Sequence, residues 1–323
     1  MHPSHVLFQG NHQPVTIPVC DHYAGSEKLM RKSLALQQTL GPVFDITFDC
    51  EDGAATGYEA AHAELVGSLI AGSENSFGRI GARVHDVDSP YFEQDVATIC
   101  GLAARRLAYL VIPKIESASQ LAQAAELVAR HAGMAGRTDL PVHVLIETHR
   151  ALHEVWDIAA IAGVECLSFG IMDFVSAHYG AVPSDAMRSP GQFSHPLIMR
   201  AKLEIAAACH AHGKVPSHNV CTEIRNMSVV ASDATLACKQ FGYQRMWSIH
   251  PDQIPHILAS FAPDADEIDD AVEILCLAQA ADWGPIQHQG KLHDRASYRY
   301  FWTVLLRAKQ TGQSLPARAS ALV

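Results

Sequence analysis

The sequence predicts a (β/α)8 barrel, because short apolar runs alternate with amphipathic segments along most of the chain. Apolar runs rich in β-branched residues are typical of strands that are buried on both faces of a sheet. A doubly wound open sheet is the alternative, but no G-x-G-x-x-G turn follows the first strand. The eight predicted strands cover residues 15–19, 43–48, 79–84, 107–112, 142–146, 166–169, 214–216 and 245–249.

Helical patterns follow these strands, as a barrel of this kind requires. Ser26 is a good cap for a helix that runs to about Leu40, and Ser117 for one that runs to about His131. A polar loop with proline and glycine is expected over 183–192. The remaining helices are predicted near residues 58–70, 91–104, 151–161, 174, 195–212, 222–239 and from 251 onward.

The alternation of strands and helices stops near residue 260. Beyond it, the sequence predicts an acidic helix over 264–281 and a basic helix over 294–310, joined by a linker over 283–293. We therefore expect three parts along the chain. They are a loose N-terminal arm at 1–13, a barrel at 14–260, and a C-terminal helical lid or oligomerisation segment at 261–323.

Composition narrows the class of function. A chain of 323 residues with 48% hydrophobic residues can bury a large core, and its net charge of −10 argues against a nucleic-acid partner. No apolar run reaches the roughly 18 residues that a membrane helix needs, and the start lacks a signal-peptide pattern. Eight cysteines without a C-x-x-C pair are typical of reduced thiols. We expect a cytoplasmic protein that contacts neither nucleic acid nor membrane.

Two carboxylates stand where predicted strands end. Glu147 directly follows the run 142–146, and Asp173 lies in the turn after the next strand. The carboxyl ends of barrel strands converge on one face, so these side chains are expected to meet there. Carboxylates without histidine or cysteine beside them suit a hard ion such as Mg²⁺, with Mn²⁺ as a substitute. The alternative is that both residues only cap the helices that follow.

Other strand ends carry further ionisable groups. Arg83 follows the third strand and either clamps a substrate carboxylate or pairs with a neighbouring acid. Lys114 follows the fourth strand and either forms a Schiff base, as in metal-free aldolases, or serves as a structural ion-pair partner. The 19 histidines show no spacing typical of a metal site, so we expect no histidine-bound metal.

Six segments between residues 43 and 254 resemble, in the same order, the signature segments of citrate lyase β-subunit-like proteins of the HpcH/HpaI aldolase superfamily. Phe48–Gly53 resembles D-L-E-D-[AG], Ala82–Asp86 resembles V-R-I-N, Val111–Ser117 matches L-P-K-x-E-[ST], Ile146–Thr148 is I-E-T, Phe169–Phe174 resembles F-G-x-x-D-[LF], and Trp247–Ile254 is close to [KW]-x-I-H-P-x-Q-[IV].

This resemblance implies a (β/α)8 barrel that assembles into trimers or hexamers and acts as a magnesium-dependent carbon–carbon lyase. The glutamate of I-E-T and the aspartate of F-G-x-x-D bind Mg²⁺ in the family, which here implies Glu147 and Asp173. The arginine of V-R-I-N holds the keto acid, which implies Arg83, and Gly170 is implied beside the substrate. The expected substrate is a 3-hydroxyacid thioester of CoA, such as malyl-, citramalyl- or citryl-CoA.

The resemblance also implies the acid–base groups. The acidic turn after the second strand lines the family's site, which implies Glu51 and Asp52. The segment 290–295 looks similar to a C-terminal lid whose aspartate reaches into a neighbouring subunit's site, which implies Asp294. These three residues are the expected catalytic groups, because crowded carboxylates raise one another's pKa into a useful range.

Several positions depart from the family pattern. Its first strand carries an arginine near its start and ends in P-G-[SD], whereas Pro18–Tyr23 stands here; His85 replaces the asparagine of V-R-I-N, and Gly242–Arg245 lacks F-D-G-K. The substrate is therefore expected to differ from citryl thioester. Three alternatives stay open: a metal-dependent pyruvate aldolase on free hydroxy-keto acids, an imine-forming aldolase, and a non-catalytic subunit that binds keto acid.

Overall fold

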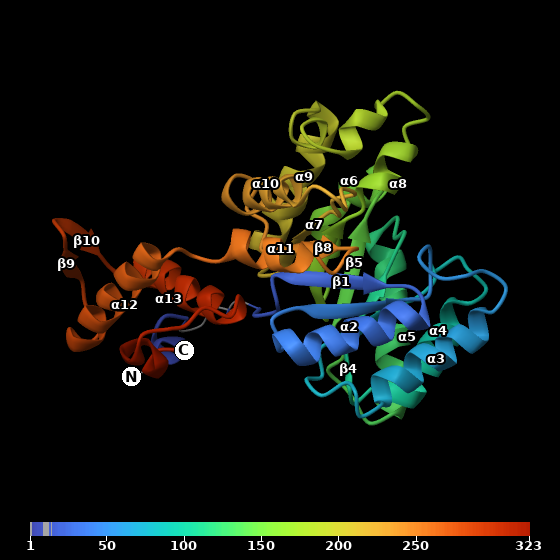
Figure 1. Cartoon of the computed structure of the whole chain (residues 1–323), viewed down its shortest axis with the longest axis horizontal. Coiled ribbons are helices and arrows are strands. Elements are labelled where there is room, and N and C mark those ends of the chain that lie inside the picture. Colours follow the sequence, from blue (N-terminus) through green and yellow to red (C-terminus); the bar gives the residue numbers. More distant parts are fainter. Residues whose placement is uncertain (1, 9–12, 14) are drawn as a thin grey trace. The chain divides into compact units, whose positions relative to one another are not determined.

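The computed structural model describes residues 2–8, 13 and 15–323. The chain divides into two compact units (Figure 1). One unit is Cys20–Ser260, and the other joins Phe261–Val323 to the described residues up to Val19. No helix in the described part of the chain is long and apolar enough to cross a membrane.

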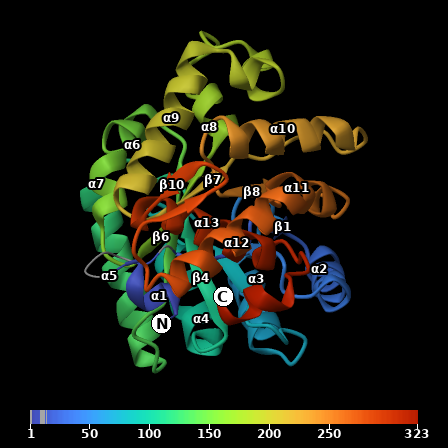
Figure 2. The ribbon, with the colours of Figure 1, turned by 90° about the vertical axis from the view of Figure 1, so that its left-hand side faces the viewer.

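The first unit confirms the predicted (β/α)8 barrel. Eight parallel strands close in chain order, and the pairing of Cys20 on the first with Met246 on the last completes the ring. Helices surround the strands, as a second view shows (Figure 2). The strands are β1 (Cys20–Ala24), β2 (Asp45–Asp49), β3 (Ile80–Arg83), β4 (Leu107–Ile112), β5 (Val142–Ile146), β6 (Val164–Phe169), β7 (Val215–His218) and β8 (Arg245–Ser248).

The helices around the barrel follow the predicted order, and Ser26 and Ser117 cap theirs through side-chain oxygens as expected. The helix predicted over 151–161 is instead two short helices that meet at Glu154. The helices are α2 (Glu27–Leu40), α3 (Glu59–Ala71), α4 (Phe92–Ala103), α5 (Ala118–Met134), α6 (His149–His153), α7 (Val155–Ala160), α8 (Ile171–Ser176), α9 (Pro196–Ala211), α10 (Met227–Lys239) and α11 (Gln253–Phe261), with 3-10 turns η1 (Ser184–Met187) and η2 (Gly191–Phe193) in the loop before α9.

The predicted first strand, 15–19, is wrong. The first strand instead begins at Cys20 and includes the buried Asp21. A carboxylate is tolerated there because Thr47 and Arg245 bind it inside the barrel. Gly25 and Ser26 therefore follow the strand, so its end resembles the family's P-G-[SD] more closely than the sequence suggested. The departure from that motif is reduced to an alanine in place of the proline.

The second unit is a small helical body with its own core. Tyr298 and Trp302 pack there with Val6 and Leu7, so the loose arm expected at 1–13 is wrong for residues 3–8, while 1 and 9–12 lie outside the described residues. The expected linker over 283–293 is an antiparallel hairpin. The elements of this unit are α1 (Pro3–Val6), α12 (Ala265–Ala280), β9 (Ile286–His288), β10 (Lys291–His293), α13 (Arg295–Gln310) and η3 (Ala317–Ala321). Its role as lid or oligomerisation arm stays a prediction.

Candidate active site

A group of charged side chains gathers at the carboxyl ends of the barrel strands. Two of its members, Asp49 and Arg83, are the last residues of β2 and β3. Glu147 follows β5, and Asp173 lies in the first turn of α8. The group, called the mouth cluster below, consists of Asp49, Glu51, Asp52, Arg83, Lys114, Glu147 and Asp173.

Arg83 is held by two carboxylates. Its Nε and Nη2 donate to the two oxygens of Asp49 at 2.7 and 2.6 Å, and its Nη1 lies 2.8 Å from Glu51 Oε2. The guanidinium also lies 5.5 Å from the ring centre of Tyr23, which stacks on Trp247. A guanidinium has five N–H groups, so these contacts leave one on each terminal nitrogen for a substrate oxygen. Arg83 is thus an ion-pair partner that keeps N–H groups available for a substrate.

Asp49 organises the acidic turn after β2, a role that the sequence reading missed. Its two oxygens accept hydrogen bonds from the backbone of Glu51 at 3.0 Å and of Gly53 at 2.8 Å. Burial would raise the pKa of Asp49, but the charge of Arg83 and these hydrogen bonds lower it. A Cβ on Gly25 would overlap the carbonyl of Gly53, so a glycine after β1 is needed for the turn to pack there.

Lys114 bridges the acidic turn and the neighbouring strands. Its ammonium contacts Glu51 and lies 3.4 Å from Asp52, whose side chain is 59% exposed. Burial alone would lower the pKa of Lys114, but its contacts with these two acids raise it above the ordinary value. A lysine held as an ammonium is not a nucleophilic amine, so the contacts favour the ion-pair interpretation over the Schiff base.

Glu147 is almost fully buried, and one of its oxygens, Oε1, accepts a 2.5 Å hydrogen bond from the backbone of Lys114. The other oxygen, Oε2, faces Gly170, where an added Cβ would come within 2.5 Å of it. Burial, with the nearby charge of Asp173, raises the pKa of Glu147 to about 8 although the Lys114 hydrogen bond opposes the shift. Glu147 and Asp173 therefore lie within electrostatic range of each other.

The donor set of the mouth cluster fits a hard divalent cation. Five carboxylates face two cationic side chains, and a buried carboxylate with a raised pKa is stabilised when a cation replaces its proton. Glu147 and Asp173 could hold such an ion, with water or substrate oxygens completing its shell. Among the described residues, no group of three or more histidine, cysteine, aspartate or glutamate side chains forms a site by itself.

Asp294 lies in the other unit, where it caps α13. Its side chain accepts a 2.9 Å hydrogen bond from the backbone of Ala296, and Ser297 completes a reciprocal capping box. The side chain is exposed at the end of the β9–β10 hairpin. Its predicted approach to the site of a neighbouring copy stays a prediction.

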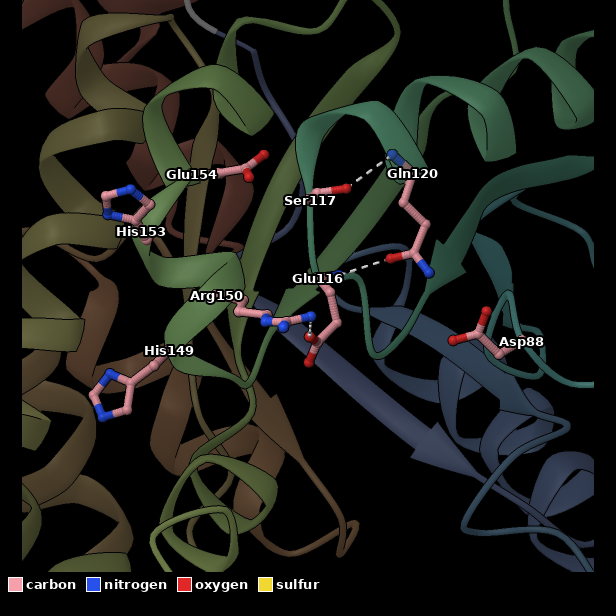
Figure 3. Close-up of a pocket in the computed structure, with 8 residues that line it drawn as sticks. All are labelled: Asp88, Glu116, Ser117, Gln120, His149, Arg150, His153 and Glu154. Carbon is pink, nitrogen blue, oxygen red and sulfur yellow. Dashed lines mark hydrogen bonds and ion pairs between the residues drawn. The ribbon is translucent and has the colours of Figure 1, made fainter.

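A polar cavity of about 670 Å³ lies among the loops that follow β3, β4 and β5 (Figure 3). Within it, Arg150 reaches to Glu116, with 3.3 Å between Nη1 and Oε2. None of the predicted site residues lines this cavity, although Glu116 is two residues from Lys114 and His149 two from Glu147. Its lining residues are Asp88, Glu116, Ser117, Gln120, His149, Arg150, His153 and Glu154.

Comparison with known proteins identifies the family. The model of the HpcH/HpaI aldolase/citrate lyase family matches residues 34–251. The chain belongs to this family. A similar protein of Cereibacter sphaeroides, the L-malyl-CoA/beta-methylmalyl-CoA lyase, is 26% identical over 278 residues that cover 82% of this chain and 87% of the lyase. The chain is accordingly a carbon–carbon lyase by class, and its substrate is the open question.

Solved structures give the same fold. A crystal structure of a citrate lyase from Burkholderia xenovorans is 57% identical, covers 100% of both chains and superposes with a TM-score of 0.86. The CitE protein of Mycobacterium tuberculosis, in complex with magnesium, acetoacetate and coenzyme A, is 20% identical over 91% of this chain and 99% of its own, with a TM-score of 0.69. At that identity the second likeness shows the fold alone.

Proposed function

We propose that this chain is a Mg²⁺-dependent lyase that reversibly cleaves a 3-hydroxyacid thioester of CoA into a keto acid and an acyl thioester. The carrying observation is that Glu147 lies within electrostatic range of both Asp173 and Arg83 at the carboxyl ends of the strands. Relatives named for malyl-CoA and citramalyl-CoA cleavage support the thioester class. Malyl-, citramalyl- and citryl-like thioesters are the candidate substrates.

Glu147 and Asp173 would hold the cation, and Mn²⁺ would serve in place of Mg²⁺. When bound, the ion supplies Lewis acidity that polarises a carbonyl of the keto acid. A protein of the same fold, the citrate lyase beta subunit of Mycobacterium tuberculosis, was solved in complex with oxaloacetate and magnesium, which supports magnesium as the ion. Gly170 leaves space beside Glu147 Oε2 for an ion or a substrate oxygen, because a side chain there would collide with that oxygen.

Arg83 would orient the substrate and stabilise negative charge. Its remaining N–H groups point from a guanidinium that Asp49 and Glu51 fix in place, so little reorganisation accompanies the reaction. The half-buried ring of Tyr23 beneath the guanidinium supports the same orientation. Arg83 and Tyr23 together would thus form a fixed surface that binds the carboxylate or carbonyl oxygen of the keto acid.

Cleavage breaks the bond between the hydroxyl-bearing carbon and the carbon next to the thioester carbonyl. The hydroxyl proton leaves as the new carbonyl forms, and the electron pair of the broken bond passes to the thioester enolate, which takes up a proton at carbon. Glu51 and Asp52 are the proposed acceptors of the hydroxyl proton. Asp294 of a neighbouring copy, in a trimer or hexamer, is the proposed donor to carbon.

The test is a substrate panel with metal control. The metal-free protein is incubated with malyl-, citramalyl- and citryl-CoA and with free hydroxy-keto acids, and products are separated with and without added Mg²⁺. We expect one of the thioesters to be cleaved to an acyl-CoA and a keto acid, and we expect this cleavage to require Mg²⁺. Equal turnover without metal would overturn the proposal, and cleavage of free acids alone would favour the pyruvate-aldolase alternative.

The position of Asp294 is tested by mixing two inactive variants. If Asp294 acts on a neighbouring site, oligomers co-assembled from Glu147→Gln and Asp294→Asn chains regain activity. After random mixing in equal amounts, about a quarter of all sites combine an intact Glu147 with an intact Asp294 from the neighbouring copy. About a quarter of the wild-type activity should therefore return. No recovery in verified mixed oligomers would place Asp294 outside the neighbouring site.

A further inference from the structure

Lys114 has a backbone conformation that its residue type disfavours. It follows Pro113 directly after β4 and has a φ of +52°, in the left-handed region where a Cβ is crowded. The conformation is held by a short hydrogen bond, since its N–H donates to Glu147 Oε1 at 2.5 Å. A strained residue whose strain aims a backbone donor at a buried carboxylate points to a positioning role.

The side chain of the same residue reaches the opposite side of the mouth. Its ammonium contacts Glu51 Oε1 and lies 3.4 Å from Asp52, and it is 35% exposed. Glu51 in turn binds Arg83 through its other oxygen at 2.8 Å. Lys114 is therefore a single residue that connects the carboxylate proposed for the cation with the groups proposed for the substrate.

We infer that Lys114 is a positioning residue with two separable tasks. Its left-handed backbone fixes Glu147 so that Oε2, the oxygen beside Gly170, is the one presented to the cation. Its ammonium fixes Glu51 against Arg83 and so orients the substrate clamp. This inference rests on the proposed function, and it assigns the two tasks to different atoms of one residue.

The two tasks predict different responses to substitution. Glycine at 114 keeps the left-handed backbone and its N–H but removes the ammonium. Valine also removes the ammonium, but a β-branched side chain strongly disfavours a positive φ and turns the N–H away from Glu147. Arginine keeps a positive charge for Glu51 and Asp52. The pair Lys114→Gly and Lys114→Val therefore isolates the backbone task.

Calorimetry measures the Mg²⁺ affinity of each variant. Steady-state kinetics then gives kcat and KM as separate values. We expect Lys114→Val to bind Mg²⁺ about 10-fold more weakly than Lys114→Gly, the effect typical of a lost group that orients a ligand. Lys114→Gly should bind Mg²⁺ within about threefold of wild type but lose about 100-fold in kcat/KM, and Lys114→Arg should recover most of that loss. The exposed Lys32→Ala serves as the control for loss of a lysine.

Each outcome decides one point. Equal Mg²⁺ affinity of the glycine and valine variants would overturn the backbone task, and wild-type kcat/KM in Lys114→Gly would overturn the ammonium task. If the valine variant does not fold, Lys114→Ala replaces it, with a smaller loss expected because alanine is not β-branched. Wild-type protein that binds no Mg²⁺ at all would instead refute the proposed function, whatever the Lys114 variants do.

Discussion

The barrel holds two arginine–carboxylate clusters, one at each end of its strands, and they differ in charge balance. At the amino ends, Arg245 binds Asp45 at 2.6 Å and Asp21 at 3.0 Å, and Arg79 binds Asp45 at 3.1 Å. Two arginines thus match two carboxylates, and the hydroxyl of Tyr109 adds further hydrogen bonds. This floor cluster, Asp21, Asp45, Arg79 and Arg245, is closed and balanced.

The mouth cluster has an excess of carboxylates over cationic side chains and is partly open to solvent. The two clusters use the same residue types, so residue type alone does not separate structural from functional charge. Unmatched charge separates the two kinds of cluster, because burying a carboxylate without a cationic partner costs free energy unless a bound ligand neutralises it. In (β/α)8 barrels the amino face serves stability and the carboxyl face serves chemistry, and the two clusters follow that division.

The largest effect is expected from Glu147→Gln, which removes one charge of the mouth cluster without changing its size. We expect kcat/KM to fall about 10,000-fold, about 5 kcal/mol of transition-state stabilisation, because the cation loses its buried ligand. Steady-state kinetics at saturating Mg²⁺ would measure it. The control is Glu116→Gln, another glutamate after a strand, which pairs with exposed Arg150 and should change kcat/KM less than threefold. Similar losses in both variants would contradict the comparison.

Arg245→Met tests the floor cluster. Removing the buried Arg245 leaves Asp21 without its cationic partner and Asp45 with Arg79 alone, so the free energy of unfolding should fall by about 3–5 kcal/mol. Urea denaturation would measure the change. The matched control is Arg31→Met, whose pairs with Glu27 and Glu74 are exposed and should contribute no more than about 1 kcal/mol. A folded Arg245→Met protein that is as stable as the control would show that the floor cluster is not structural.

Arg83→Lys keeps the charge of the mouth cluster but removes the planar fork. Lysine cannot bind Asp49 through two parallel hydrogen bonds and still present N–H groups to a substrate, so kcat/KM should fall about 100-fold. Thermal denaturation should show a much smaller effect on stability than Arg245→Met does. A KM increase with kcat unchanged would assign Arg83 to ground-state binding rather than to charge stabilisation in the transition state.

The sequence predicted the carboxyl end of the barrel better than the amino end of its first strand. Runs such as 107–112 and 142–146 are apolar throughout, and the structure places β4 and β5 at those limits. The strand Cys20–Ala24 carries Asp21 and Tyr23 toward partners within the barrel, so an apolar criterion passes over it. A search for apolar runs finds strands whose residues are all apolar. It misses a strand such as β1, whose polar side chains point into the barrel interior.

The candidate site was predictable where it depended on position along a strand. Glu147 stands directly after β5, and Asp173 lies in the first turn of the helix after β6, so topology places both at the carboxyl ends of neighbouring strands. The role of Asp49 in holding Arg83 depends on side-chain direction, and the backbone donor of Lys114 depends on one φ angle. Local sequence determines neither the side-chain direction nor the φ angle, because both depend on tertiary contacts.

Gly170→Ala sharpens the comparison within the mouth cluster. The added Cβ would come within 2.5 Å of Glu147 Oε2, so the carboxylate must move and Mg²⁺ affinity should fall about 10-fold. Calorimetric titration of Mg²⁺ would measure it. Gly133→Ala, at a helical glycine with open space around it, is the control and should leave the affinity unchanged. An unchanged affinity in Gly170→Ala would mean that the ion does not use Oε2.

A further effect is the contribution of Glu147 in the mouth cluster to the pH dependence of stability. Burial and Asp173 raise the pKa of Glu147 to about 8 without a cation, above its value in the unfolded chain. A carboxyl group with a raised folded-state pKa favours the folded state when protonated. The ionisation of Glu147 should therefore lower the stability of the metal-free protein as pH rises from about 5 to about 8.

Magnesium should reverse this trend, because the cation takes the place of the proton on Glu147. Thermal denaturation at pH 6 and pH 8 would show a larger Mg²⁺-induced rise in Tm at pH 8, by a few degrees. Glu147→Gln should reduce the pH dependence of the metal-free protein by the share that Glu147 contributes, and it should remove the reversal by Mg²⁺. The floor cluster offers no site for the cation, because Arg245 and Arg79 already occupy its carboxylates. Equal Mg²⁺ stabilisation at both pH values would show that Glu147 is not the group whose proton the cation displaces.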